Sequence, residues 1–405
     1  MTGPENLPTR EERHSTFSLM QREVSYMVYQ EGRRFQRHLS LVVASLAVAV
    51  TLGLVGCHGE EHAVKLNDDL VRRTDKFFDV AHVSGGTFVI VGYDGRILRS
   101  EDNGGSWKEI ARPTNFSLTQ VSFVGENGWA VGHQGTVVST RDGGKTWTLQ
   151  KSNTTKALFS VSFVDQNHGW ACGDESTWLW TDNGGETWTA ERMEVSQVGL
   201  SEQTTLAVPD IIYYGVQFID SQNGWMIGEY GNIRHTADGG KTWDSQHESL
   251  LDQMVAKGGN KDVMALGAFF RVQFTDPQNG IIVGAAGAIA TTNDGGTKWQ
   301  WVSREGDKPD VPPLHIYNAV LPGQNGHVVA TGTNGLVLLS ENKGADWKPA
   351  TIPGGVFTWI NGIAFSPEGK GVLVGGKGLI LLSDDAGQSW RAFEEKKGAA
   401  KAAHS

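Results

Sequence analysis

The 405-residue sequence is short of cysteine and of positive charge, and each shortage excludes a class of protein. Its two cysteines, Cys57 and Cys172, are too few for a disulfide-stabilised scaffold or for a zinc site of paired Cys-x-x-Cys motifs. The net charge of −10 argues against nucleic acid as a partner of the chain as a whole. The glycines, although numerous, follow no Gly-X-Y period, so the chain is not collagen-like.

Several motifs that carry catalysis are also absent. The chain contains no nucleophile elbow, no phosphate-binding loop and no His-Glu-x-x-His zinc motif. We therefore expect no metal, no cofactor and no catalytic residue, which favours a binding protein over an enzyme.

One uncharged hydrophobic run, residues 39–56 (LSLVVASLAVAVTLGLVG), has the layout of a signal peptide. It follows three arginines and ends in small residues before Cys57. Residues 54–57 (LVGC) are similar to a bacterial lipoprotein signal, in which the cysteine becomes the lipidated N-terminus. The run is slightly shorter than the roughly 20 residues with which a helix crosses a bilayer. We predict lipid attachment at Cys57, with an uncleaved anchor and ordinary secretion as alternatives, and all three place the remainder outside the cytoplasm.

The charge divides at this point. Residues 1–56 carry +1 and the remainder −11, so the exported part should not bind anionic lipid by charge. We expect a disordered polar extension (1–38), a signal segment (39–57), a linker or outer strand (58–76), a repeat domain (77–393) and a disordered tail (394–405).

Glycine, with 52 residues, and tryptophan, with 14, are over-represented because one octapeptide recurs. Its pattern is S/T-x-D/N-x-G-x-x-W, and it occurs seven times: SEDNGGSW, TRDGGKTW, TDNGGETW, TADGGKTW, TNDGGTKW, SENKGADW and SDDAGQSW. Successive copies of its tryptophan are 40, 41, 55, 56, 48 and 43 residues apart. A repeat of this length indicates a solenoid, propeller or array.

Two further elements precede each octapeptide and complete a four-stranded unit. An apolar strand ending in glycine precedes it (such as WAVG), strand c follows that strand's turn, and most units begin with a strand of the VxFV type. Four short strands per unit, seven times, predict an all-β, seven-bladed β-propeller with one blade per repeat. Each repeat holds a complete set of strands a to d, so closure should need no exchanged strand.

The octapeptide resembles the Asp-box, or BNR repeat, of sialidase-like propellers. Its Asp or Asn can accept backbone N–H groups within the c–d turn, and its Trp can cover the hairpin. We assign all fourteen residues to structure: Asp102, Trp107, Asp142, Trp147, Asn183, Trp188, Asp238, Trp243, Asp294, Trp299, Asn342, Trp347, Asp385 and Trp390.

Function should therefore lie on the opposite face, where the b–c and d–a loops gather. Two d–a connections, roughly 189–213 and 244–269, are long, and Trp301 and Trp359 lie in other connections as candidates for an exposed contact. The candidate binding rim around the channel is Tyr93, Asp94, Arg99, His133, Gln134, Asp174, Glu175, Glu229, Tyr230, Asn334 and Lys377.

Two kinds of binding remain open from these residues. A sialidase-like propeller that binds or hydrolyses glycans would use a pair of rim carboxylates, such as Asp174 and Glu229. The Arg-Ile-Pro motif of sialidases is absent, and those enzymes have six blades. The other reading is a monomeric, non-catalytic propeller, tethered to the membrane by its lipid, that assists the assembly or stability of a membrane protein. A purely structural envelope module is a third hypothesis.

Seven repeats of the form VxFxDxxxGWxVGxxGxIxxTxDGGxTW resemble the photosystem II stability/assembly factor family. The clearest copies are residues 121–147, 161–188 and 216–243, and the resemblance covers about residues 77–393. It implies a seven-bladed, non-enzymatic chaperone that binds a new photosystem II core subunit on the lumenal side of the thylakoid membrane. Family members with a lipoprotein signal are similar to this chain at Cys57.

One departure from the family bears on the partner. The family carries an arginine in strand c of several blades, and here Arg99 of the first repeat is the one copy that keeps it. The pattern also fits a relative from a non-photosynthetic bacterium, whose partner would be another envelope protein of the periplasm.

Overall fold

The computed structural model describes residues 70–194, 210–259, 265–303, 311–312, 314–320 and 326–394, which belong to one compact unit. The predicted extension, the signal segment with Cys57 and the C-terminal tail lie outside the described residues. Within the described part, no helix has the length and apolar character needed to cross a membrane.

Seven four-stranded antiparallel sheets make up the unit, and each consists of four consecutive strands, a to d from the centre outward. Blades 1 to 3 contain β1 (Phe77–His82), β2 (Phe88–Gly92), β3 (Ile97–Ser100), β4 (Lys108–Ile110); β5 (Leu118–Val124), β6 (Asn127–Gly132), β7 (Val137–Thr140), β8 (Thr148–Gln150); β9 (Leu158–Phe163), β10 (Gly169–Gly173), β11 (Thr177–Thr181), β12 (Thr189–Arg192). Blades 4 and 5 contain β13 (Tyr213–Phe218), β14 (Gly224–Gly228), β15 (Ile233–Thr236), β16 (Asp244–Ser245); β17 (Phe269–Phe274), β18 (Gly280–Gly284), β19 (Ile289–Thr292), β20 (Gln300–Ser303). Blades 6 and 7 contain β21 (Ile316–Val320), β22 (Val328–Gly332), β23 (Val337–Ser340), β24 (Lys348–Pro349); β25 (Ile360–Phe365), β26 (Gly371–Gly375), β27 (Ile380–Ser383), β28 (Arg391–Ala392).

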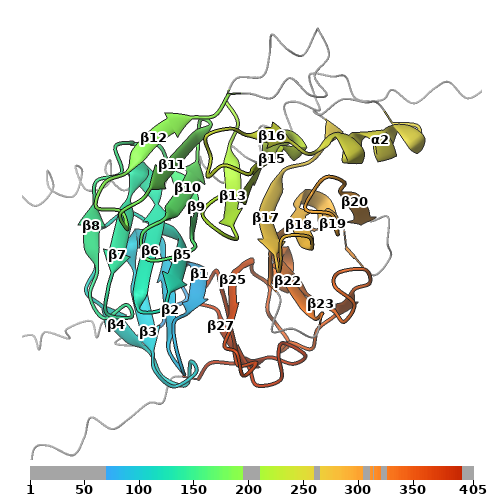
Figure 1. Ribbon diagram of the computed structural model, residues 1–405. Coiled ribbons are helices and arrows are strands. Elements are labelled where there is room, and N and C mark those ends of the chain that lie inside the picture. The colour runs from blue at the N-terminus through green and yellow to red at the C-terminus, as the bar shows by residue number, and fades with distance from the viewer. Residues whose placement is uncertain are drawn as a thin grey trace, which may run out of the picture. The chain divides into compact units, whose positions relative to one another are not determined.

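The predicted seven-bladed propeller is thus confirmed, and it closes without an exchanged strand. Strand a of each blade contacts strand a of the next, and β25 contacts β1 to complete the ring. Figure 1 shows these inner strands around a common centre, with the outer strands at the periphery.

The chain just before β1 reinforces this closure between blades 7 and 1. Lys76 forms an isolated antiparallel bridge with Gly376, and the Gly378 N–H donates to the Asp75 carbonyl at 2.8 Å. The Asp75 carboxylate pairs with the buried Arg96. Residues 70–76 form no outer strand, and residues 58–69, where we also predicted one, lie outside the described part.

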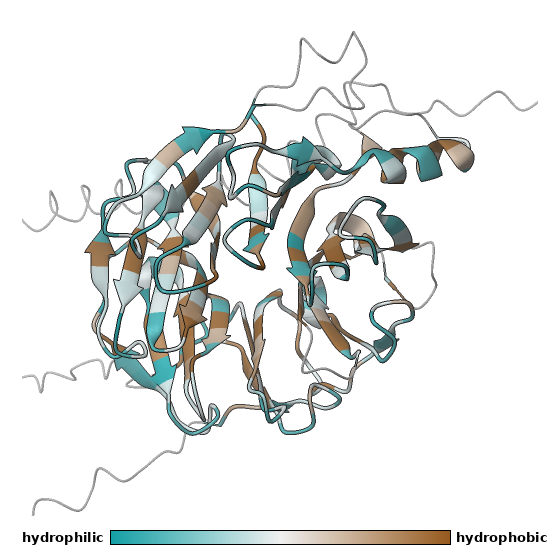
Figure 2. Cartoon of the chain, in the orientation of Figure 1, coloured by the Kyte–Doolittle hydropathy of each residue, from teal (hydrophilic) through white to brown (hydrophobic). Residues whose placement is uncertain are grey.

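The core lies between adjacent blades, because the inner strands are apolar on both faces. Strand b is fully buried in six blades and, in blade 2, from its second residue on, and Figure 2 shows brown, hydrophobic segments along the inner strands. The tryptophan of the GWxVG element packs on the next blade, as Trp129 does by stacking on Phe163 with ring centroids 3.5 Å apart. The equivalent pairs of blades 3 and 4 stack at 3.6 Å.

Each octapeptide forms the same c–d turn. In the fourth copy, the Thr236 hydroxyl donates to Asp238 at 2.8 Å and accepts the Gly240 N–H at 2.9 Å, while Asp238 also accepts the Thr242 N–H at 2.9 Å. All seven copies have these three hydrogen bonds. Hydrogen bonds from Thr242 lower the pKa of Asp238 to about 2. The repeated acids therefore serve their own turns.

A second junction, between the b–c turn and strand a, also recurs in all seven blades. The first residue of the turn donates its N–H to the carbonyl just before strand a, as His133 does to Ser117 at 3.0 Å. The preceding glycine permits this approach, since a Cβ on Gly132 would lie 1.9 Å from the Ser117 oxygen. The six equivalent glycines would place a Cβ between 2.0 and 2.4 Å from the corresponding oxygen. These contacts explain the glycine that ends every strand b.

One long d–a connection contains the helix α2 (Glu248–Ala256), which covers the outer edge of blade 5. Its Ser249 hydroxyl accepts the Trp299 N–H at 2.9 Å, and Gln253 Oε1 accepts the Trp301 N–H at 3.1 Å. The Trp301 indole N–H donates to the Leu250 carbonyl at 3.3 Å. Our expectation that Trp301 is an exposed contact is therefore wrong, because its ring packs under this helix.

Replacing Gly132 should test the b–c junction. Because a Cβ would overlap the Ser117 carbonyl, we expect Gly132→Ala to lower the free energy of unfolding by about 1–3 kcal/mol. Gly354→Ala is the matched control, since nothing lies within 4 Å of its Cβ position. Denaturant unfolding of both variants measures the difference, and equal stability would contradict the proposed close approach.

Candidate functional site

The b–c junction distorts the start of strand a in every blade and leaves one side chain at the channel mouth. The register between strands a and b skips the second residue of strand a, a β-bulge, in all seven sheets. The skipped residues are half-buried, whereas their neighbours on both sides are mostly buried. They are Phe78, Thr119, Phe159, Tyr214, Phe270, Tyr317 and Asn361.

Four of these side chains form a continuous set of rings across blades 3 to 6, which we call the aromatic arc: Phe159, Tyr214, Phe270 and Tyr317. Their successive ring centroids are 5.7, 5.3 and 5.5 Å apart, with interplanar angles of 45°, 77° and 46°. His315 extends the arc, with its ring 6.0 Å from Phe270. The tilted rings give a curved apolar lining at this end of the channel.

The remaining bulge positions differ in chemistry. Phe78 stacks on Trp359 with centroids 5.5 Å apart, which places Trp359 at the mouth as a packed but half-exposed ring. The Thr119 hydroxyl donates to the Leu158 carbonyl of the next blade at 2.7 Å. The Asn361 carbonyl accepts the Asn318 side-chain N–H at 2.9 Å. The mouth is therefore aromatic over blades 3 to 6 and mixed elsewhere.

Carboxylates from two b–c turns influence the pKa of Tyr214 in the aromatic arc. Burial raises the pKa of Tyr214, and the negative charges of Glu229 and Asp174 raise it further. Glu229 is held in place by accepting the Ile212 N–H at 3.0 Å. Burial lowers the pKa of His315, so its imidazole stays neutral near pH 7. Glu229 and Asp174 thus place negative charge near Tyr214 on this side of the mouth.

A buried carboxyl of blade 1, Asp79, interacts electrostatically with Arg271 of blade 5. Burial raises the pKa of Asp79 to about 6, although the positive charge of Arg271 acts in the opposite direction. Asp79 Oδ2 accepts the Val121 N–H at 3.1 Å and so joins blade 1 to blade 2. Cys172 is fully buried, and burial raises the pKa of its thiol, so it is not a reactive thiolate.

Ten of the eleven residues of the predicted rim lie in the b–c turns of this face: Tyr93, Asp94, His133, Gln134, Asp174, Glu175, Glu229, Tyr230, Asn334 and Lys377. The second residue of every b–c turn has a left-handed φ between 50° and 61°, although none of them is glycine. Because it recurs in all seven blades, this conformation belongs to the turn geometry of the repeat and marks no single blade as a site.

Several of these side chains are engaged by the d–a connections. Asp94 pairs with Arg112 at 3.3 Å, and Glu175 pairs with Lys156 at 2.5 Å. The Lys377 ammonium donates to the Phe357 carbonyl at 3.2 Å. Two of the four rim carboxylates are therefore neutralised by ion pairs at the periphery.

Arg99 does not belong to the rim, which corrects our prediction. It lies near the end of β3, and its Nε donates to the Gly143 carbonyl in the Asp-box turn of blade 2 at 2.7 Å. Its Nη1 pairs with Glu101 at 2.5 Å. Strand c runs from the b–c turn to the c–d turn, so a residue at its end reaches the opposite face.

Exposed aromatic side chains gather on the same face as the rim. Tyr93 of a b–c turn is 44% exposed, and Phe116 and Phe357 of two d–a connections are 50% and 74% exposed. Among the described residues, the other large exposed apolar side chains are Leu149 on an outer strand and Val255 on α2. The b–c and d–a face is therefore the more apolar end of the described propeller.

Our sequence reasoning missed the aromatic arc. A detectable signal existed, because the aromatic follows the first residue of strand a in five repeats: FFDV, LFSV, YYGV, FFRV and IYNA. The bulge that turns it to the channel mouth has no sequence signature of its own.

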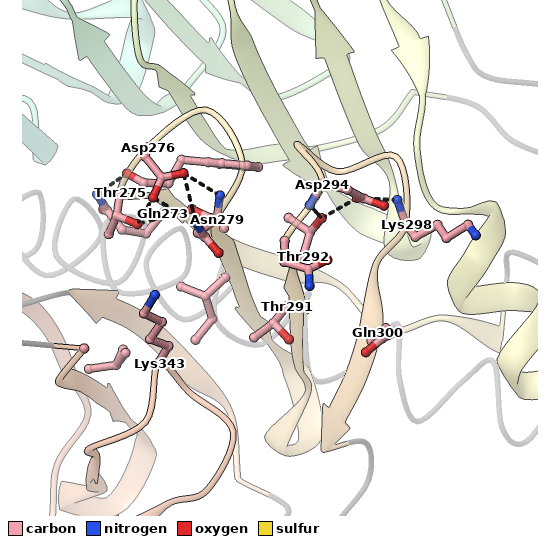
Figure 3. Close-up of a pocket in the computed structure, with 16 residues that line it drawn as sticks. Gln273, Thr275, Asp276, Asn279, Thr291, Thr292, Asp294, Lys298, Gln300 and Lys343 are labelled. Atoms are coloured by element: carbon pink, nitrogen blue, oxygen red, sulfur yellow. Dashed lines mark hydrogen bonds between the residues drawn. The ribbon is translucent and has the colours of Figure 1, made fainter.

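A polar groove of about 770 Å³ lies on the other face, between blades 5 and 6 (Figure 3). It occurs where the tryptophan of strand b is replaced by Ile281, so the inter-blade ring stack is missing. Its carboxylates are used locally: Asp276 accepts the Asn279 side-chain N–H at 2.9 Å, and Asp294 accepts the Lys298 N–H at 2.9 Å. The groove is thus lined by turns whose carboxylates already accept hydrogen bonds from their own residues.

Within the described ranges, no group of three or more His, Cys, Asp or Glu side chains is arranged to hold a metal ion.

The fold and its repeated turns define a seven-bladed propeller of the Asp-box class. Residues 63–153 and 256–354, a little under half of the chain, match the model of the family described as photosynthesis system II assembly factor YCF48. The chain resembles this family, as its repeats predict.

One relative in sequence and two solved structures are similar to this chain. The photosystem II assembly lipoprotein Ycf48 of Synechococcus sp. (strain CC9902) is 36% identical over 76 residues, which span 19% of this chain and 22% of that relative. The structure of YCF48 bound to D1 peptide has a TM-score of 0.56 at 17% identity, covering 77% of this chain and 92% of the other. The GH74 xyloglucanase of Xanthomonas campestris has a TM-score of 0.58 at 10% identity, covering 79% and 54%. The two structures share the propeller fold with this chain.

Replacing Asp79 should test whether its carboxyl is buried, through the pH dependence of the free energy of unfolding. Its folded pKa of about 6 exceeds the unfolded value of about 3.9, so its contribution to stability is present below pH 4 and lost as the pH rises through 6. Asp79→Asn keeps an acceptor for Val121 and removes this titration. We expect wild type to lose about 1–3 kcal/mol relative to Asp79→Asn between pH 4 and 7, measured by denaturant unfolding. Parallel pH curves would contradict the buried placement.

Proposed function

We propose that this chain is a non-catalytic, membrane-tethered propeller that binds a membrane protein through its b–c and d–a face and assists the assembly or stability of that protein. In a photosynthetic source the partner is a photosystem II core subunit, and in another bacterium it is a different envelope protein. The observation that carries the proposal is the concentration of exposed and half-exposed aromatic rings on this one face. Surfaces of this kind are typical of protein interfaces.

The similar proteins support the partner class. One relative is named an assembly lipoprotein, and one structural neighbour is described as bound to a D1 peptide. We accordingly propose that Cys57 carries a lipid and that the propeller faces the periplasm or the thylakoid lumen. The propeller acts as a monomer, without a cofactor.

The absence of catalysis is part of the proposal. A glycosidase needs two carboxylates free to act as acid and base or nucleophile. Asp94 and Glu175 are paired with Arg112 and Lys156 at the periphery of the rim. The candidate pair Asp174 and Glu229 accepts backbone N–H groups. The Asp-box acids are likewise occupied by their own turns.

Site-specific photo-crosslinking in native membranes tests this function. We expect a photoreactive residue at Tyr93, Phe116 or Phe357 of the full chain to capture one dominant membrane protein, because these side chains are exposed on the proposed face. Leu149 is the matched control, since it is 56% exposed on an outer strand away from that face.

Two results would contradict the proposal. Equal capture from Leu149 would mean that the face is not the docking surface. Unchanged abundance of the captured protein after deletion of the chain would favour a purely structural module.

A further inference from the structure

The aromatic arc and the carboxylates of Asp174 and Glu229 form one site, and its side chains indicate which kind of ligand it would bind. The arc lines blades 3 to 6 with four half-buried rings in contact with one another. Asp174 and Glu229 come from the b–c turns of blades 3 and 4 and act electrostatically on Tyr214 at the centre of the arc. Aromatic faces next to carboxylates attract cations, through the ring quadrupole and through charge.

We propose that this site receives a cationic side chain, a lysine or arginine, from an extended segment of the partner. The inference rests on the proposed function, which it deepens by naming the chemistry of the contact.

The ring geometry favours a compact cation over a sugar. A pyranose stacks on a flat, exposed ring face, whereas neighbouring rings of the arc are inclined by 45° to 77° and partly cover one another. A guanidinium or ammonium group fits against several inclined rings at once, and each such contact strengthens when water is excluded.

The carboxylates are fixed before any ligand arrives. Glu229 accepts the Ile212 N–H at 3.0 Å and donates its own N–H to the Ile212 carbonyl at 3.0 Å. Asp174 donates its N–H to the Ala157 carbonyl at 2.9 Å and accepts the Glu175 N–H at 2.8 Å. Both turns are therefore anchored to the start of strand a, so little side-chain entropy is lost on binding.

The other charged and titratable groups near the arc leave its negative character intact. Burial lowers the pKa of both His133 and His315, so neither imidazole adds positive charge near pH 7. Lys156 is paired with Glu175. Arg271 follows Phe270 along the strand, and its charge acts on the buried Asp79 and Cys172.

The opposite side of the mouth carries ammonium groups beside its aromatic rings. Lys76 lies over the Tyr93 ring at 5.2 Å, and Lys377 donates to the Phe357 carbonyl, so blades 7 and 1 present ammonium groups. A bound cation is thereby directed toward blades 3 to 6. The net charge of −11 on the exported part increases the rate of encounter with a basic segment.

Fluorescence anisotropy with two labelled decapeptides, one of alternating glycine and arginine and one of alternating glycine and glutamate, tests the proposal on the full-length protein. We expect the arginine peptide to bind at least tenfold more tightly than the glutamate peptide. The double variants Asp174→Asn/Glu229→Gln and Tyr214→Leu/Phe270→Leu should each weaken arginine-peptide binding at least tenfold. Tyr214→Phe, which keeps the ring, should bind like wild type.

The matched control is Asp182→Asn/Glu186→Gln, which removes the same charge from an exposed Asp-box turn of blade 3. We expect it to change binding less than twofold, and circular dichroism should show that every variant folds. An equal loss in the control would overturn the proposal, because long-range charge would then explain the binding. Saturable binding of xyloglucan oligosaccharides that is lost in Tyr214→Leu/Phe270→Leu, with no preference for the arginine peptide, would overturn it in favour of a glycan site.

The same variants separate this inference from the proposed function. If Tyr93 still crosslinks to the membrane partner while neither double variant weakens the arginine peptide, the cation site is wrong and the docking face stands. If crosslinking itself fails, the proposed function is wrong.

Discussion

The close approach of each b–c turn to the start of strand a is the constraint on which the rest of the structure depends. A glycine without a Cβ lets the next N–H reach the carbonyl before strand a, and this contact recurs in all seven blades. The turn displaces one residue of strand a from the ladder, and that residue is left half-buried at the channel mouth. The backbone thus fixes seven positions, and their side chains determine the chemistry of the mouth.

The two faces of the propeller use their polar residues in different ways. On the Asp-box face, the repeated acids accept hydrogen bonds from their own turns, so little capacity remains for a ligand. On the other face, carboxylates and aromatic rings differ from blade to blade. Residues that repeat in every blade maintain the fold, whereas those that differ create an asymmetric surface with an aromatic, acidic side and a basic side.

Much of the fold could be predicted because the residues that determine the shape of each blade lie within its own repeat. The contacts of these residues are short in range. The glycine after strand b and the Asp or Asn of the turn contact residues of their own blade, and the tryptophans pack on their own hairpin or on the adjacent blade. The b–c turn residues were located for the same reason. Arg99 was misplaced because the direction of a side chain at a strand end depends on the neighbouring blade, where Gly143 accepts its hydrogen bond.

The recurring aromatic of strand a could be recognised in the sequence, but its assembly into the aromatic arc and the position of α2 could not, on physical grounds. The arc depends on a β-bulge and on contacts between residues about 50 positions apart, such as Phe159 and Tyr214. Similarly, Trp301 is buried because a helix formed by an insertion supplies hydrogen-bond acceptors to the edge of blade 5. Both features arise from tertiary contacts between segments whose local sequence is ordinary.

Hydrogen exchange of the full chain, with and without its membrane partner, tests most directly the claim that the channel-mouth face is the docking surface. We predict slower exchange in the b–c turns and at the starts of strand a, above all in blades 3 to 6, with the Asp-box turns unchanged. Slower exchange confined to the Asp-box turns would contradict it.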